Sequence, residues 1–335
     1  MINIGVVGYG YWGPNLVRNF AANEETNVVA VCDRDEQRLG QVKRLYPIVR
    51  LTTSAEELIN ASDVDAVVVA TPVDAHFPLA LAGLQAGKHV FVEKPIASTA
   101  EQAQRLIDEA DKRGLILAVD HTFVYTGAVR KMHELIRAPA FGKVRYYDST
   151  RVNLGLFQHD VNVLWDLAVH DLSIMNFILD GAPVAVSATG HCHLPGQPEY
   201  AAFLTVFMDD GTIGHVNVNW LSPVKIRRTL VGGEGQMIVY DDLETSEKIK
   251  LYDKGITVSE RPEDVHKLLI SYRTGDLWSP NLPATEALAV EVKHFAACVE
   301  GRDKPITGGS AGLDVVRILE AADRSMSERG APVEL

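Results

Sequence analysis

The segment GYGYWG at residues 8–13 fits the pattern G-x-G-x-x-G and lies between a short apolar run and a segment of helical character. Asp33 ends the next apolar run, 20 residues beyond Gly13. In a dinucleotide-binding βαβ unit, Gly8 permits a tight turn, Gly10 lets the backbone approach a pyrophosphate, and Gly13 allows close packing of helix on strand. The order strand, glycine loop, helix, strand and acid therefore predicts a dinucleotide-binding fold at the start of the chain.

The same stretch indicates the cofactor. The N-terminus of a helix offers free N–H groups and the positive end of its dipole to phosphates. A carboxylate at Asp33 can accept hydrogen bonds from both hydroxyls of a ribose and would repel a 2′-phosphate, which favours NAD. Arg34 keeps NADP open as the alternative, because a guanidinium here can pair with a 2′-phosphate or stack on adenine.

Residues 1–120 alternate between short runs rich in Val and Ile and longer helical patterns. Expected strands cover residues 2–7, 27–32, 66–70, 89–92 and 115–119, and expected helices cover residues 13–22, 36–46, 55–60, 75–86 and 100–112. The strands are continuous apolar runs, as in a parallel sheet that is buried on both faces. Repeated βαβ units predict an α/β fold with a Rossmann-type, doubly wound parallel sheet.

Residues 121–335 show a different pattern. Helices are expected at residues 128–136, 166–179, 284–299 and 311–329, and strands at residues 184–191, 201–208, 213–220, 227–231, 237–240 and 248–252. Alternating strands joined by hairpin turns predict an α+β domain with a largely antiparallel, open sheet. We expect two domains: residues 1–120 bind the cofactor, and residues 121–335 bind substrate and mediate oligomerisation. The last helices are placed so that they can pack back on the first domain.

Composition excludes several classes of protein. The chain has 335 residues and a formal net charge of −12, from 32 basic and 44 acidic residues. This balance argues against a nucleic-acid binder, and no apolar run approaches the ~20 residues of a membrane span. No cationic segment precedes an apolar one at the N-terminus, and three scattered cysteines do not make a disulfide framework. We expect a cytoplasmic protein that binds neither nucleic acid nor membranes.

Three further motifs follow the glycine loop in order. They are Ala70-Thr71-Pro72 with His76, Glu93-Lys94-Pro95, and the segment WDLAVHD at residues 165–171. Together with the glycine loop they resemble the Gfo/Idh/MocA family of nicotinamide-dependent sugar and inositol oxidoreductases, over nearly the whole chain. The resemblance implies an NAD(P)-dependent sugar dehydrogenase or ketoreductase acting on CH–OH groups. Within the family, the sequence is similar to the branch that acts on nucleotide-linked sugars.

The chemistry of three residues agrees with this implication. Lys94 ends a parallel strand, where open α/β sheets bind ligands, and Pro95 disfavours helical geometry there. Its ammonium can stabilise charge on a substrate oxygen. Asp166 and His170 are four residues apart and share a face of the expected helix, and an imidazole can take a hydroxyl proton near neutral pH. We expect Lys94, Asp166 and His170 to be catalytic, with Asp171 next in line if the register differs. The alternatives are a surface lysine and a helix-start carboxylate beside a packed histidine.

Two sets of binding residues follow. For the cofactor we expect Gly8, Gly10, Tyr11, Trp12, Gly13, Asp33, Arg34, Thr71, Pro72, His76, Glu93 and Lys94. For the substrate we expect Lys94, His121, Arg151, Asn153, Asn162, Asp166 and His170. Residues 151–155 and 157–162 place many hydrogen-bonding side chains in what we expect to be one loop, as a polyol substrate requires. His121 lies in Asp120-His121-Thr122, where many family members carry Asn, and the role of this segment stays open.

No metal is expected. His191-Cys192-His193 has two histidines on one face of a strand, but without further ligands these indicate a solvated sheet rather than a metal site. His266 and His294 are interpreted as surface or packing residues.

The sequence therefore predicts reversible hydride transfer between nicotinamide C4 and a ring carbon of a sugar. The resemblance alone implies C3 of a nucleotide-linked hexose. A free-sugar or inositol dehydrogenase of the same family is one alternative, and a non-catalytic NAD(P)-binding regulatory protein is another, since a fold does not guarantee chemistry.

We also expect a homodimer or homotetramer formed through the second sheet. Val216, Val218 and Trp220 alternate with polar residues, and a large uncovered apolar face would mark a contact. Similar family members pair through this sheet.

Overall fold

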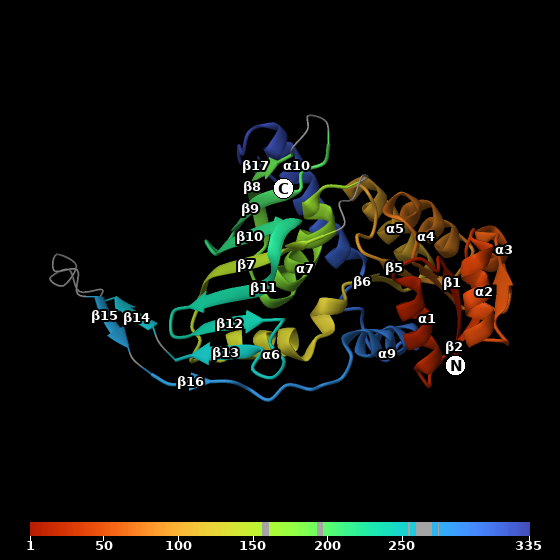
Figure 1. Cartoon of the computed structure of the whole chain (residues 1–335), viewed down its shortest axis with the longest axis horizontal. Helices are drawn as coiled ribbons and strands as arrows, with labels where there is room; N and C mark the ends of the chain where they lie inside the picture. Colours follow the sequence, from red (N-terminus) through yellow and green to blue (C-terminus); the bar gives the residue numbers. More distant parts are fainter. Residues whose placement is uncertain (156–160, 193–196, 254, 259–269, 274) are drawn as a thin grey trace. The chain divides into compact units, whose positions relative to one another are not determined.

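The computed structural model describes residues 1–155, 161–192, 197–253, 255–258, 270–273 and 275–335. The chain divides into two compact units (Figure 1). The first comprises residues 1–126 and 285–320, and the second comprises residues 127–284 and 321–335. The chain thus leaves the first unit once and returns to it.

The first unit is built on a six-stranded sheet in the order β3-β2-β1-β4-β5-β6. Its strands are β1 (Ile2–Val7), β2 (Thr26–Cys32), β3 (Arg50–Thr52), β4 (Ala66–Val69), β5 (His89–Glu93) and β6 (Leu117–Asp120). All neighbouring strands pair in parallel. The predicted doubly wound parallel sheet is therefore confirmed, with β3 as a strand that the sequence patterns did not indicate.

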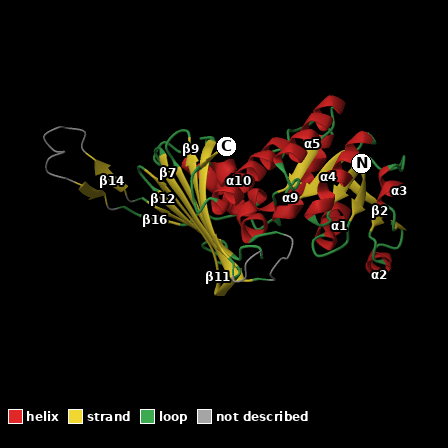
Figure 2. Ribbon diagram, turned by 90° about the horizontal axis from the view of Figure 1, so that it is seen from above, coloured by secondary structure: helices red, strands yellow, loops and turns green. Residues whose placement is uncertain are grey.

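Helices cover both faces of this sheet (Figure 2). They are α1 (Gly13–Ala22), α2 (Glu36–Leu45), α3 (Ala55–Ile59), α4 (His76–Gln85), α5 (Ala100–Arg113) and α9 (Ala287–Val299), with short 3-10 turns η1 (Val73–Ala75) and η2 (Thr122–Tyr125). Phe20 of α1 and Phe295 of α9 pack edge-to-face on Phe91 of β5. Gly83 of α4 lies against Val90 on the opposite face. These contacts form the core that supports the strand ends.

The second unit contains a nine-stranded sheet in the order β16-β13-β12-β11-β7-β10-β9-β8-β17 (Figure 1). Its strands are β7 (Val144–Leu154), β8 (Pro183–His191), β9 (Ala201–Met208), β10 (Ile213–Asn219), β11 (Leu221–Gly233), β12 (Met237–Asp241), β13 (Ile249–Tyr252), β16 (Leu277–Trp278) and β17 (Val333–Glu334). The described pairings are antiparallel except that of β7 with β10. This confirms a largely antiparallel second sheet. Strands β14 (Gly255–Val258) and β15 (Ile270–Arg273) form a separate pair.

The remaining helices are α6 (Gly127–Ile136), the π-helical turn η3 (Leu164–Ala168), α7 (Val169–Ile178) and α10 (Gly309–Ser327). The helix expected over residues 166–179 therefore starts earlier and opens with a wider turn. The boundary between the two units falls within α10. No described helix is long and apolar enough to cross a membrane.

Two expectations for the second unit were wrong. Residues 151–155 were expected in a loop, but Arg151 and Asn153 lie on β7, inside the sheet. The apolar row of β10 was expected to be uncovered, but Val216 and Val218 are completely buried inside the unit. The other face of the sheet is the open one, and it carries polar residues together with exposed Phe203 and Ile213.

Candidate active site

The glycine loop connects β1 to α1. Gly8 has φ +102°, and a Cβ there would overlap the carbonyl oxygen of Ala70. A Cβ on Gly13 would overlap the carbonyl of Gly8, whereas a Cβ on Gly10 would meet only the tip of Arg38. Helix α1 begins without a side-chain cap, so its first N–H groups have no side-chain acceptor. This open, uncapped turn fits a dinucleotide pyrophosphate.

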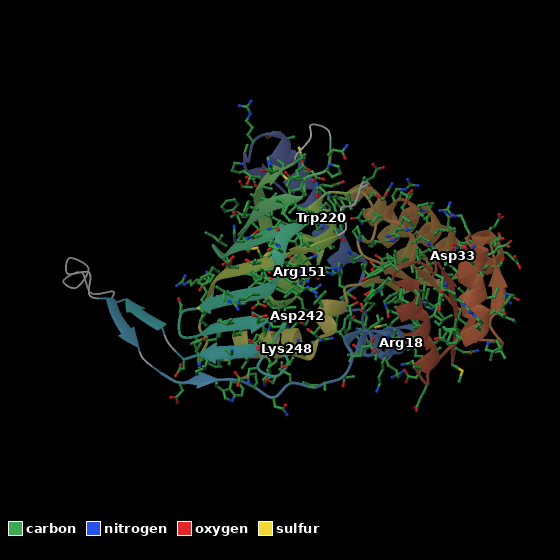
Figure 3. All side chains as sticks on the ribbon, in the orientation of Figure 1. Arg18, Asp33, Arg151, Trp220, Asp242 and Lys248 are labelled. Carbon is green, nitrogen blue, oxygen red and sulfur yellow. The ribbon has the colours of Figure 1, made fainter. Side chains whose placement is uncertain are left out.

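The carboxylate of Asp33 faces the loop from the end of β2 (Figure 3). It is 8% exposed and accepts hydrogen bonds from the backbone N–H groups of Tyr9, at 2.7 Å, and Asp35, at 2.9 Å. The guanidinium of Arg38 lies 3.5 Å from it. Arg34 is exposed. Arg38 was not predicted from the sequence. It lies three residues beyond the N-cap Asp35 and pairs with that carboxylate as well, at 3.5 Å, so this i,i+3 spacing could have indicated it.

Lys94 and His121 follow two paired strand ends. Glu93 of β5 and Asp120 of β6 are register partners, so the next residue of each strand lies at the same carboxyl edge of the sheet. His121 is 2% exposed, and neither of its ring nitrogens has a hydrogen-bond partner among the described residues. Burial and the neighbouring Lys94 lower the pKa of His121 to about 3, so the ring is neutral at physiological pH.

His76 connects two loops at this edge. Its Nδ1 lies 2.7 Å from the carbonyl oxygen of Pro95, and its Nε2 lies 2.8 Å from that of Thr71. The ring is 1% exposed. Because both nitrogens face backbone carbonyls, the His76 ring connects the loops that follow β4 and β5. The Lys94–Pro95 peptide bond is cis.

The other expected cofactor residues occupy different environments. Tyr11 is 95% exposed, and Pro72 is also exposed. Trp12 is partly buried, and its indole Nε1 donates a 2.6 Å hydrogen bond to Asp120. Glu93 is partly buried and is the register partner of Asp120 in the sheet. The contact between Trp12 and Asp120 places the glycine loop next to the end of β6 in the first unit.

In the second unit, Asp171 anchors the start of α7. Its carboxylate accepts hydrogen bonds from Ser149 Oγ and from Arg151 Nε, both at 2.6 Å, and its carbonyl accepts one from the Tyr147 hydroxyl. These donors are alternate residues of β7, so their side chains point to the same face. His170 is partly buried and immediately precedes this anchor. Asp171 thus fixes the position of His170.

Asp166 is held separately. Its carboxylate accepts a 3.0 Å hydrogen bond from the indole Nε1 of Trp220. Gly155 lies beside the same indole, where a Cβ would be crowded by the ring, and its N–H donates to the carbonyl of Trp220. Asn153, two residues earlier on β7, is partly exposed at this end of the sheet. Trp220, which was expected only on an uncovered apolar row as an oligomer contact, is buried instead and holds the Asp166 carboxylate. The position of Trp220 is labelled in Figure 3.

Arg151 and Asn162 have partners of their own. Arg151 is 4% exposed and forms an ion pair with Asp171. The Asn162 side chain donates to Asp323 at 2.8 Å, and its Oδ1 accepts from the Leu164 N–H at 3.0 Å. Both side chains thus hold secondary structure in place. Residues 157–160, His193 and His266 lie outside the described residues.

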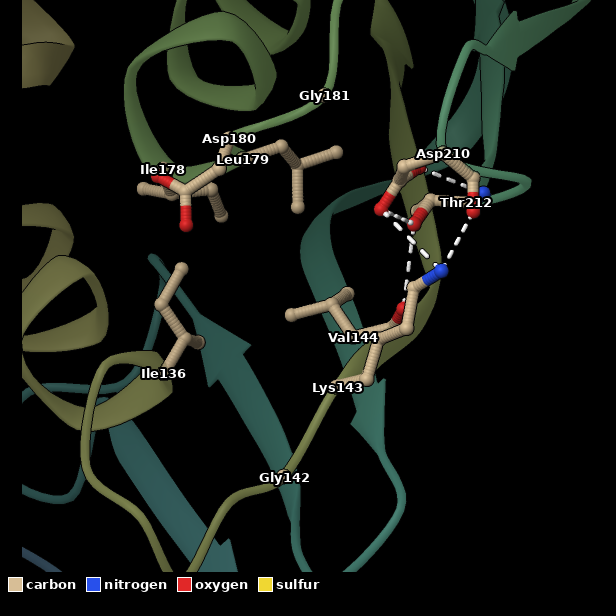
Figure 4. Close-up of a pocket in the computed structure, with 10 residues that line it drawn as sticks. All are labelled: Ile136, Gly142, Lys143, Val144, Ile178, Leu179, Asp180, Gly181, Asp210 and Thr212. Atoms are coloured by element: carbon tan, nitrogen blue, oxygen red, sulfur yellow. Dashed lines mark hydrogen bonds and ion pairs between the residues drawn. The ribbon is translucent and has the colours of Figure 1, made fainter.

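The second unit also contains a cavity of about 130 Å³ between α6, α7 and β7 (Figure 4). It is lined by Ile136, Gly142, Lys143, Val144, Ile178, Leu179, Asp180, Gly181, Asp210 and Thr212. None of the expected catalytic or binding residues lines it, so it is separate from the candidate site.

Comparison with known proteins matches both units. Residues 2–121 match the oxidoreductase family with an NAD-binding Rossmann fold (GFO/IDH/MocA), and residues 129–239 match the GFO/IDH/MocA C-terminal domain. UDP-N-acetylglucosamine 3-dehydrogenase of Acidithiobacillus ferrooxidans is 26% identical, over 95% of this chain and 94% of that protein. The NAD⁺-dependent scyllo-inositol 2-dehydrogenase of Bacillus subtilis is 25% identical, over 100% and 95%. The crystal structure of GenD2 from gentamicin A biosynthesis, in complex with NAD, is similar with a TM-score of 0.83 and 25% identity, over 100% and 96%.

Proposed function

Since the chain belongs to the Gfo/Idh/MocA family of NAD-binding oxidoreductases, we propose that it oxidises or reduces C3 of a nucleotide-linked hexose. The similarity to UDP-N-acetylglucosamine 3-dehydrogenase supports the choice of carbon and of substrate class, and one structural observation supports the oxidoreductase chemistry. Lys94 lies at the carboxyl edge of the parallel sheet, next to a buried neutral imidazole whose nitrogens have no partner among the described residues, in the unit that carries the glycine loop. This edge is where open α/β sheets bind ligands.

NAD is the proposed cofactor. The uncapped start of α1 would hold the pyrophosphate, and Asp33 would accept the ribose hydroxyls. When bound, a nicotinamide supplies or accepts the hydride. Arg34 and Arg38 next to Asp33 keep NADP as the alternative.

Three residues are proposed to act on the sugar. The imidazole of His170 takes the proton from the reacting hydroxyl, and the Lys94 ammonium stabilises the negative charge that develops on that oxygen. The Asp166 carboxylate orients the sugar or the imidazole. Support for these roles comes from Asp171 and Trp220, which hold His170 and Asp166 in defined positions in the second unit.

The remaining expected substrate residues divide into two groups. His121, being neutral, can donate one hydrogen bond and accept another, which suits a sugar hydroxyl. Asn153 is proposed to bind substrate at the end of β7. Arg151 and Asn162 are proposed to position α7 and η3, because their polar atoms are engaged within the protein.

The alternatives differ in what they turn over. A free-sugar or inositol dehydrogenase would reduce NAD with those compounds, and the similarity to scyllo-inositol 2-dehydrogenase favours including them in a panel. A regulatory protein would bind NADH and turn over nothing. The experiment is therefore NAD reduction with UDP- and dTDP-hexoses, free hexoses and inositols. Turnover with the nucleotide-linked group alone supports the proposal.

We propose that a second copy covers the open face of the nine-stranded sheet, giving a homodimer or homotetramer. Phe203 and Ile213 are 51% and 46% exposed on this face. Exposed apolar side chains grouped on one face are typical of a protein–protein contact. Phe203→Lys should lower the molar mass found by light scattering, whereas Leu45→Lys on α2, at an even more exposed apolar residue, should not. A cytoplasmic location is proposed on the three unpaired cysteines, which suit a reducing compartment.

A further inference from the structure

Two acidic side chains are buried together beneath the glycine loop. Asp120 ends β6 and is 2% exposed, and Glu291 projects from α9 and is 1% exposed. The two residues are far apart in the sequence, and neither belongs to the proposed catalytic set. Two ionised carboxylates side by side in a buried site would repel each other strongly.

Their hydrogen bonds are unequal. Asp120 accepts from the Trp12 indole at 2.6 Å and from the Thr122 hydroxyl. Glu291 lies beside Asp120 and Thr122, yet when both acids are ionised neither of its carboxyl oxygens has a hydrogen-bond partner among the described residues. A buried carboxylate without a donor is costly, whereas a protonated carboxyl can itself donate. The acceptor within its reach is the Asp120 carboxylate.

We infer that Glu291 is a positioning residue whose carboxyl group stays protonated and donates a hydrogen bond to the Asp120 carboxylate. This acid pair in turn holds the Trp12 indole of the glycine loop. NADH affinity then depends on the proton of the pair. The inference rests on the proposed cofactor site only for this last consequence. The shared proton itself requires neither cofactor nor substrate.

The surrounding charges support a retained proton. Glu291 lies near two other acids, Asp120 on β6 and Glu93 on β5. Burial together with these two acids raises the pKa of Glu291 well above its ordinary value. Burial also raises the pKa of Asp120, against the hydrogen bonds from Thr122 and Trp12. Further titratable groups at this edge are Lys94 and His121, the next residues along β5 and β6, and His76, whose ring contacts the carbonyl of Pro95. The proton is therefore expected to stay through neutral pH.

Infrared difference spectroscopy of the protein without cofactor tests the shared proton. The spectrum of wild type minus Glu291→Gln at neutral pH should show a protonated-carboxyl stretching band that shifts in heavy water. Glu300→Gln, at an exposed acid just after α9, serves as the control and should show no such band. If the wild-type protein shows no carboxylic-acid band at neutral pH, the inference is overturned, even if Glu291→Gln fails to fold.

The pH dependence of NADH affinity tests the positioning role. In wild type, the Kd should be constant at low pH and rise up to tenfold per pH unit once the pair loses its proton. Glu291→Gln, whose amide donates at every pH, should keep the neutral-pH Kd and lose the rise. A rise of the same size in both proteins would overturn the role. A wild type that shows the infrared band but does not bind NADH would instead contradict the cofactor proposal.

Discussion

The indole Nε1 of Trp12 donates a 2.6 Å hydrogen bond to the carboxylate of Asp120, which lies 108 residues further along the chain. The bond joins the loop after β1 to the end of β6, although these strands are separated by β4 and β5 in the sheet. Lys94 and His121 lie at the same carboxyl edge. The glycine loop and the strand ends that precede Lys94 and His121 are therefore connected within the first unit.

Gly8→Ala should abolish NADH binding and destabilise the first unit. The residue has φ +102°, and a Cβ there would overlap the Ala70 carbonyl, so strain of at least about 1–3 kcal/mol is expected. Fluorescence titration with NADH and thermal unfolding measure the two effects. Gly40→Ala on α2 is the control, because nothing lies within 4 Å of its Cβ position, and it should be neutral or stabilising. Equal behaviour of the two variants would contradict the role of Gly8.

Asp33→Asn should shift cofactor preference toward NADP. The amide keeps an acceptor for the Tyr9 N–H and removes the charge that repels a 2′-phosphate, with Arg38 nearby to pair with it. The ratio of NADPH to NADH affinity should rise about tenfold or more, which corresponds to about 1.4 kcal/mol. Glu36→Gln, at an exposed acid in the first turn of α2, should leave the ratio unchanged. An unchanged ratio in Asp33→Asn would show that this carboxylate does not select the cofactor.

Lys94→Ala and His170→Ala should each lower kcat by about 10²–10⁴ and leave NADH affinity nearly intact. Neither residue belongs to the glycine loop. Steady-state kinetics on the best substrate, together with NADH titration, separate the two effects. Lys43→Ala and His191→Ala, at surface positions, are the matched controls. Near-normal kcat in both active-site variants would refute the assigned chemistry while leaving the fold unaffected.

Arg151→Met should lower the free energy of unfolding by about 3–5 kcal/mol, because it leaves the buried Asp171 carboxylate without its cation. Burial acts to lower the pKa of Arg151, but the charge of Asp171, its hydrogen bond to the guanidinium and the nearby Tyr240 and Tyr147 together raise it, so the guanidinium stays ionised. Arg50→Met, in an exposed pair with Asp63, should cost no more than about 1 kcal/mol. Urea unfolding compares the two. Similar losses would mean that the ion pair does not hold α7.

Glu291 should make stability fall with rising pH. Its pKa is raised in the folded protein, so above its ordinary pKa the native state binds a proton that the unfolded state has released. The free energy of unfolding therefore decreases as pH rises, by up to about 1.4 kcal/mol per pH unit, until the pair ionises. Urea midpoints of wild type and Glu291→Gln, measured from about pH 5 to 8, should differ in slope. Parallel slopes would contradict the retained proton.

Local patterns predicted the first unit well. The strands around Gly8 and Asp33 are continuous apolar runs, which made them easy to locate. Residues that bind ligands in such sheets directly follow the strand ends, so their positions in the sequence were sufficient to predict them. Strand β7 was missed because polar Ser149 and Arg151 occupy its inward positions, where alternation predicts apolar side chains. Asp171, 22 and 20 residues away, satisfies them. That partnership exists only in the folded chain.

The supporting residues of the site were harder to predict than the reacting ones. Lys94 and His170 stand in motifs of adjacent residues. Glu291 acts through Asp120, and Trp220 acts through Asp166, 54 residues before it. No spacing in the sequence indicates such pairs, because they depend on which strand and helix ends meet.

The most direct test of the central claim follows a labelled hydrogen. The protein is incubated with NAD and a panel of UDP- and dTDP-hexoses that carry deuterium at C3, and the reduced nicotinamide is analysed by mass spectrometry. Transfer of a ring hydride from C3 predicts one deuterium in the reduced cofactor with at least one of these sugars, and formation of this product at least about a hundredfold slower with Lys94→Ala. Reduced cofactor without deuterium, or no reduction with any of them while free sugars or inositols react, would contradict the assignment.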